Sequence, residues 1–141
     1  MCRSFSRLRQ YAFAATTLAV LALAAHVATA SEPAKGAIRV VAGKTKLVFV
    51  IAGFDAACRS TTYPTVTIDA GAAKGRVILR PGESTTVQYS VSGRCIGAKV
   101  EGVGIYYVAA DDAEGADAFS ITARMPGGEI ATRMFNIHIT D

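Results

Sequence analysis

The sequence of 141 residues contains no tryptophan and only two histidines, three cysteines and four prolines. Only one histidine, His138, lies after the first thirty residues, and a blue-copper centre needs two histidines together with a cysteine. The sequence also lacks the G-x-S-x-G element that positions a catalytic serine and the D-x-[DN]-x-[DN]-G spacing of a calcium-binding EF-hand. These absences favour a protein that is not an enzyme and that holds no cofactor.

The first thirty residues have the three parts of a secretory signal peptide. Three arginines in the first nine residues precede an uncharged stretch rich in alanine, leucine and valine. The tripeptide Ala28-Thr29-Ala30 then supplies the small side chains that a signal peptidase accepts. We therefore predict that residues 1–30 direct export and that cleavage follows Ala30. The alternative is an uncleaved anchor, since the apolar stretch approaches the ~20 residues of a membrane span.

Removal of this leader changes the charge balance of the chain. The whole sequence carries 15 lysines and arginines against 11 aspartates and glutamates, but three of the arginines lie in the leader, which leaves 12 against 11. A chain of nearly balanced charge has no electrostatic reason to bind nucleic acid. The remaining residues have the length of one domain, and we expect no membrane span after cleavage.

Two cysteines, Cys58 and Cys95, remain when Cys2 is lost with the leader. Two cysteines in an exported protein most often pair, so we predict a disulfide and a periplasmic or secreted location. The bond would close a loop of about 38 residues, for which the chain-entropy model gives roughly 4 kcal/mol of stability. A metal pair and a reactive thiol are the alternatives, but the sequence offers neither further ligands nor a neighbouring histidine.

The chain after the leader has the two-residue periodicity of β-strands and no helical period. A polar lead-in at residues 31–36, which we expect to be flexible, precedes the first strand. About eight strands with frequent turns predict an all-β fold, an antiparallel sandwich. The expected strands cover residues 37–42, 44–52, 65–69, 74–80, 87–91, 102–108, 119–125 and 135–139.

The predicted strands differ in how well they should be covered. Apolar residues occur on both faces at 44–52 and at 102–108, so we expect both strands to be covered on both sides and the second to be central. Residues 87–91 alternate cleanly and predict a half-buried strand. A type II turn is expected at Arg80-Pro81-Gly82-Glu83, because proline and glycine occupy its two central positions, and it predicts a hairpin.

The stretch from residue 102 to residue 125 reads as a strand, an acidic turn and a second strand. Four of its residues fit the spacing Y-x7-G-x-D-x-F, namely Tyr107, Gly115, Asp117 and Phe119. Glycine permits a positive φ in the turn, aspartate accepts backbone N–H bonds, and phenylalanine begins the buried face of the second strand. The tyrosine hydroxyl is expected to anchor the corner between the two strands.

This spacing is similar to the pattern that ends many bacterial immunoglobulin-like and cadherin-like modules of exported proteins. The similarity extends to residues 75–77, 127–128 and 135–139. The resemblance implies that residues 37–141 form an immunoglobulin-like β-sandwich of about seven or eight strands. It further implies a spacer or an adhesive unit without catalytic residues.

The acidic turn raises one question of metal binding, because Asp111, Asp112, Glu114 and Asp117 form the acidic cluster of the sequence. Carboxylates of such loops bind calcium, but a solvated turn is acidic without any metal. Taken together, the sequence predicts an exported, non-catalytic immunoglobulin-like module that binds an envelope protein or component, or serves as a structural or adhesive element. The alternative is a periplasmic enzyme or a calcium-binding protein built on the same sandwich.

Overall fold

The structure is a computed structural model that describes residues 33–90 and 92–141, so the predicted signal peptide at residues 1–30 lies outside the described residues. These residues contain seven strands and no helix, and therefore no helix that could cross a membrane. The predicted all-β sandwich is confirmed, and its seven strands agree with the expected seven or eight. The strands are β1 (Ile38–Val41), β2 (Thr45–Ile51), β3 (Thr65–Ala70), β4 (Gly75–Thr86), β5 (Lys99–Ala109), β6 (Gly115–Arg124) and β7 (Ile130–Thr140).

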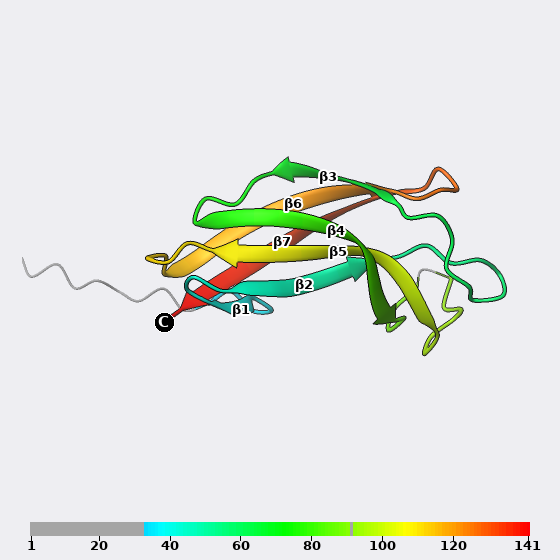
Figure 1. The fold of residues 1–141 in the computed structure, drawn as a ribbon, viewed down its shortest axis with the longest axis horizontal. Coiled ribbons are helices and arrows are strands. Elements are labelled where there is room, and N and C mark those ends of the chain that lie inside the picture. The colour runs from blue at the N-terminus through cyan, green and yellow to red at the C-terminus, as the bar shows by residue number, and fades with distance from the viewer. Residues whose placement is uncertain (1–32, 91) are drawn as a thin grey trace, which may run out of the picture.

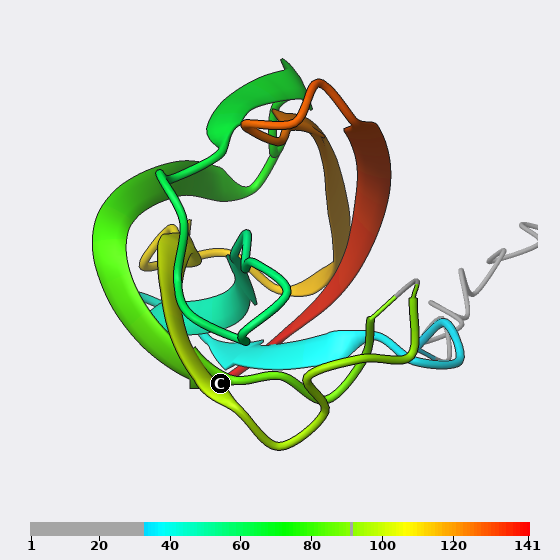
Figure 2. The same ribbon diagram turned by 90° about the vertical axis from the view of Figure 1, so that its right-hand side faces the viewer.

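The seven strands form two sheets that pack into a sandwich (Figure 1). One sheet has the order β1-β7-β6-β3 and the other the order β2-β5-β4. All neighbouring strands run antiparallel except β1 and β7, which are parallel. Figure 2, a view along the strands, shows β4 and β7 curving around opposite sides of the interior.

Strand β5 is the middle of its sheet, as the sequence predicts, and its inward residues Ile105 and Tyr107 are fully buried. The opposite sheet supplies the other half of the core from β6 and β7. Stacking of Tyr107 on Phe119 connects the two halves, since their ring centroids lie 6.1 Å apart. Within the second sheet the centroids of Phe119 and Phe135 lie 4.9 Å apart. Each fully buried side chain of this size contributes about 1.5–3 kcal/mol. The same cluster of buried residues also contains Val40, Ala109, Ile121, Ile137 and Ile139.

The connections between strands gather at two ends of the sandwich (Figure 1). We call one the turn end, because it carries the short connections β1–β2, β3–β4 and β5–β6. We call the other the loop end, because it carries the two long connections β2–β3 and β4–β5 together with the β6–β7 turn. A tight turn at residues 125–128 lies at the loop end, where the N–H of Gly128 donates to the carbonyl of Met125 at 2.9 Å.

The hairpin predicted at Arg80 to Glu83 is wrong, because β4 continues through these residues. Pro81 lies opposite Val103 and Glu83 opposite Gly102, so that Gly82 forms a bulge in the ladder. Its φ of 89° is one that glycine adopts without strain. Strand β4 is an edge strand, so one side of its backbone has no strand to pair with. Proline is tolerated on that side, because no ladder hydrogen bond requires its N–H there. The Pro-Gly pair therefore marks a bulge in place of a turn.

The strand predicted at residues 87–91 is also wrong for the described residues 87–90. They follow the end of β4 and belong to no strand, and Tyr89 is 81% exposed although Val87 is buried. Val87 bonds instead to the far side of its own connection. Its N–H donates to the carbonyl of Ala98 at 2.9 Å, and its carbonyl accepts from the N–H of Gly97 at 2.8 Å. The alternating pattern predicted a strand at these residues, but no strand of the described residues lies beside them to form a ladder.

Strand β2 is covered on one face only, contrary to the prediction from its sequence. It is an edge strand that pairs with β5 alone. Phe49 and Ile51 pack against the core, whereas Leu47 on the outer face is 39% exposed. One edge of β2 therefore faces β1 and β7 without a pairing partner among residues 33–90 and 92–141.

Candidate functional site

The four residues of the Y-x7-G-x-D-x-F spacing lie together at the turn end. Tyr107 lies near the end of β5, and the other three lie in the first half of β6. The hydroxyl of Tyr107 donates to Oδ2 of Asp117 at 2.6 Å, and its ring stacks on Phe119. Gly115 has a φ of 78°, which allows the acidic turn to enter β6 without strain.

Asp117 accepts four hydrogen bonds and thereby connects three segments of the chain. Its Oδ1 accepts the N–H groups of Ala73 at 3.1 Å and Ala118 at 2.8 Å, and its Oδ2 accepts the N–H of Lys74 at 2.9 Å and the Tyr107 hydroxyl. Ala73 and Lys74 belong to the β3–β4 connection, which crosses from one sheet to the other. The sequence predicted that Asp117 would bond to its own turn, whereas most of its donors come from a neighbouring turn and from β5.

This network shifts the pKa of both side chains. Partial burial alone raises the pKa of Asp117, but the hydrogen bonds from Tyr107, Lys74, Ala73 and Ala118 outweigh burial and hold that pKa below its ordinary value of 3.8. Burial raises the pKa of Tyr107 well above its ordinary value of 10.0, and the adjacent carboxylate raises it further. At neutral pH the pair therefore consists of a carboxylate and a neutral phenol.

The acidic cluster does not converge on a point where a metal could bind. Within the described part of the chain, no group of three or more histidine, cysteine, aspartate or glutamate side chains has the geometry to hold a metal ion. The oxygens of Asp117 are directed at Tyr107 and at backbone N–H groups. Asp112 and Glu114 are exposed, and Asp111 lies against Gly43 of the β1–β2 turn. The calcium hypothesis therefore gains no support from the geometry of this turn.

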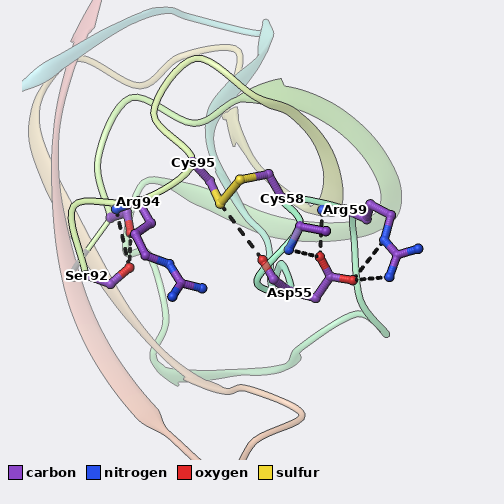
Figure 3. The surroundings of a disulfide bond; sticks show 8 residues. Asp55, Cys58, Arg59, Ser92, Arg94 and Cys95 are labelled. Atoms are coloured by element: carbon purple, nitrogen blue, oxygen red, sulfur yellow. Dashed lines mark hydrogen bonds and ion pairs between the residues drawn. A yellow bond between two sulfur atoms is a disulfide. The ribbon is translucent and has the colours of Figure 1, made fainter.

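A disulfide joins Cys58 to Cys95, with Cα atoms 5.3 Å apart, and confirms the predicted pairing (Figure 3). It links the two long connections of the loop end, β2–β3 and β4–β5. Both cysteines adopt a positive φ, of 61° and 64°, which costs a residue other than glycine about 1–3 kcal/mol. The disulfide thus holds together two loops that each contain an unfavourable backbone conformation.

Asp55 shapes the first of these loops beside the disulfide (Figure 3). Its Oδ1 accepts the N–H groups of Ala57 at 2.9 Å and Arg59 at 3.0 Å, and its Oδ2 forms an ion pair with the Arg59 guanidinium at 2.9 Å. The N–H of Glu101 in β5 donates to Oγ of Ser60 at 2.8 Å and ties the loop to the sandwich. A disulfide, an ion pair and hydrogen bonds to backbone N–H groups therefore hold the loop end in place.

A cleft of about 1540 Å³ opens beside the edge strand β2 and the first part of β7, which β1 does not cover, and we call it the β2–β7 cleft. It is lined by β2 from Leu47 onward, by β7 from Ala131 to Arg133 and by residues of the loop end. The guanidinium carbon of Arg133 lies 4.1 Å from the ring centroid of Phe49 and 5.4 Å from that of Phe135. These two rings lie 5.9 Å apart across the two sheets.

This cleft was not predicted from the sequence, although the sequence contains one signal for it. Phe135, Ile137 and Ile139 are inward residues of β7, and the same alternation assigns Arg133 to the inward face. A charged residue at an inward position indicates that the interior is open there. The alternating pattern shows which face of β7 a side chain is on, but it does not show how far β1 pairs along the edge of β7.

No family model, no curated protein and no solved structure matches this chain. The described residues define a seven-stranded, disulfide-linked β-sandwich with a hydrogen-bonded corner and an open edge. The function must therefore be inferred from strand order, contacts and exposed edges.

Proposed function

We propose that this protein is an exported immunoglobulin-like module that acts without catalysis, as a binding or structural element of the cell envelope. The strand order is the observation that carries the proposal. If the strands are lettered A to G along the chain, β2-β5-β4 corresponds to B-E-D and β7-β6-β3 to G-F-C, the orders found in the immunoglobulin sandwich. Strand β1 differs, because it pairs with the last strand and not with the second.

The disulfide supports the proposed location. Disulfides persist in oxidising compartments and are rare in the cytosol, so the Cys58–Cys95 bond is consistent with export. It agrees with the leader that the sequence predicts at residues 1–30. Together they favour the periplasm or the cell exterior.

The polar side chains discussed above make structural contacts, which favours a binding or structural role over catalysis. Asp117 and Tyr107 form a structural corner, and Asp55 and Arg59 shape a loop. His138, the only histidine after residue 30, lies on the outer side of β7 in register with Arg39 of β1. Exposed strand edges remain, and such edges take part in protein recognition.

Cell fractionation followed by intact-mass measurement of the untreated protein tests this proposal. We expect the protein in the envelope or the medium, beginning at Ser31 and lacking free thiols. A full-length chain with reduced Cys58 and Cys95 in the cytosol would contradict the proposal. In-cell cross-linking from exposed positions would then identify the envelope component that contacts the module.

A further inference from the structure

We propose that the β2–β7 cleft binds an extended strand of a partner protein. This strand carries apolar side chains at alternate positions and an acidic side chain between them that meets Arg133. The inference rests on the proposed binding function and specifies the chemistry of the partner.

Two strand edges border the cleft without a neighbouring strand in the described part of the chain. Strand β1 pairs with β7 only from Ile137 to Thr140, which leaves the edge from Ile130 to Asn136 without a strand beside it. Strand β2 pairs with β5 alone. A free edge presents N–H and C=O groups in a row, and another extended backbone satisfies them. A polypeptide strand therefore complements these edges better than a lipid or a small molecule.

The interior of the cleft suits the side chains of such a strand. Phe49 and Ile51 of β2 face it from one sheet, and Ala131 and Arg133 of β7 face it from the other. Successive residues of a strand point to opposite faces, so every second side chain of an inserted strand would be buried here. The volume of about 1540 Å³ exceeds the ~300–1,000 Å³ of pockets for small molecules.

Arg133 determines which charge the strand should carry. The one ion pair among residues 33–90 and 92–141 joins Arg59 to Asp55, so Arg133 has no carboxylate partner there. Arg133 is exposed, and its guanidinium lies against the rings of Phe49 and Phe135, where a partner strand can reach it. A carboxylate at this position would form a charge-assisted hydrogen bond, which is stronger than a neutral one.

The described residues before β1, 33–37, do not occupy the edge. Extending the register of β1 backwards would place Gly36 opposite Phe135 and Ala34 opposite Arg133. The chain turns away instead, because the N–H of Ala37 donates to the carbonyl of Ala34 at 2.9 Å and Gly36 has a φ of 84°. The edge is therefore left for a strand from elsewhere.

A second copy of this chain complements the edge poorly. Antiparallel pairing of two β7 edges about a two-fold axis at the centre of the segment from Ile130 to Asn136 places Arg133 opposite its counterpart. Like charges directly opposite each other destabilise a strand pair. Charge complementarity therefore favours a different, acidic strand.

The first test uses a defined peptide as the partner strand. The purified exported protein, labelled for NMR, is titrated with the blocked peptide Thr-Val-Thr-Glu-Thr-Val-Thr and with a control peptide in which lysine replaces glutamate. We expect saturable shifts confined to β2, β7 and the cleft lining, and binding of the glutamate peptide about 10-fold tighter than that of the control. Arg133→Gln should remove this preference, whereas Arg124→Gln, at an exposed position on β6, should retain it.

The second test fills the cleft from within the chain. The combined substitutions Pro33→Thr, Ala34→Glu, Lys35→Thr and Gly36→Val remove the turn and extend β1 along β7 in its existing register. We expect a rise in Tm of about 4 °C or more, part of which is lost when Arg133→Gln is added. The same variant should no longer bind the glutamate peptide.

Saturable binding with the charge preference, or a rise in Tm that depends on Arg133, supports the proposal. It is overturned if the peptide does not bind and the substituted chain melts no higher than wild type. Equal binding of both peptides would overturn the acidic requirement, and sedimentation showing a dimer that the glutamate peptide cannot dissociate would assign the cleft to a second copy. None of these results alters the fractionation test, so the proposed function can survive the failure of this inference.

Discussion

The hydroxyl of Tyr107 in one sheet donates a hydrogen bond of 2.6 Å to the carboxylate of Asp117 in the other. The same carboxylate accepts two N–H groups of the β3–β4 connection, which crosses between the sheets. One side chain thus fixes both sheets and the crossover at the turn end. Its contribution can be separated from that of the hydrophobic core by substitution.

We expect Asp117→Ala to destabilise the fold more than Tyr107→Phe. Removing the hydroxyl leaves a carboxylate that still accepts three N–H groups, at a cost of about 1–2 kcal/mol. Removing the carboxylate leaves the hydroxyl and several N–H groups unpaired, at a cost of about 2–4 kcal/mol. Urea unfolding measures both values, and Asp112→Ala on the exposed turn is the matched control. Equal stability of Asp117→Ala and wild type would contradict a structural role, and an Asp117-dependent rise in Tm with calcium would support the metal hypothesis.

The same carboxylate should contribute to the loss of stability in acid. Because its pKa in the folded protein lies below the ordinary value of 3.8, the folded state favours the charged form. This contribution is fully present above the unfolded pKa and is lost as the pH falls through the folded pKa. Urea unfolding between neutral pH and pH ~3 should therefore show a shallower decline in Asp117→Asn than in Asp112→Asn. Parallel curves for the two variants would refute the assignment.

Alternation predicted the inward residues of β6 and β7 well, because both strands lie in a sheet with one buried face. Phe119 and Phe135 are buried as the pattern requires. Two failures lie between Arg80 and Tyr89, where the Pro-Gly pair forms a bulge in a continuous strand and the alternating residues 87–90 belong to no strand. Both depend on which strands lie alongside, and a local pattern contains no information about neighbours.

The candidate sites were predictable to different degrees for the same reason. The disulfide followed from the number of cysteines and the predicted leader. The contact of Tyr107 with Asp117 was not specified, since spacing along the chain does not show which groups meet across two sheets. The β2–β7 cleft depends on where β1 stops pairing with β7, and only the inward position of Arg133 indicated it.

Loss of the disulfide should destabilise the protein mainly through its loop end. The bond spans 37 positions of the sequence, and the chain-entropy model assigns such a loop roughly 4 kcal/mol. The double variant Cys58→Ser, Cys95→Ser should therefore melt well below wild type, and thiol titration of the denatured, unreduced wild type should find no free thiol from this pair. Wild-type stability that is unchanged by a reductant, with both thiols then titratable, would rule out this contribution.

A glycine beside the Tyr107 corner provides the sharpest test of its packing. A Cβ atom added at Gly75 of β4 would lie 2.3 Å from the carbonyl oxygen of Val108 and 2.8 Å from the Tyr107 ring and hydroxyl. Neither neighbour can withdraw easily, because the carbonyl belongs to the central strand and the hydroxyl is bonded to Asp117. Gly75→Ala should therefore cost at least about 1–3 kcal/mol, the range for overpacked cores.

Gly71→Ala is the matched control, because a Cβ atom there meets nothing within 4 Å. Its stability should stay within about 0.5 kcal/mol of wild type, as for most surface substitutions. Chemical denaturation gives both values, and the tyrosine near-ultraviolet signal reports whether the ring of Tyr107 has moved. If Gly75→Ala were as stable as Gly71→Ala, β4 would not lie this close to Tyr107 and Val108. The corner that joins the two sheets would then need to be rebuilt from different contacts.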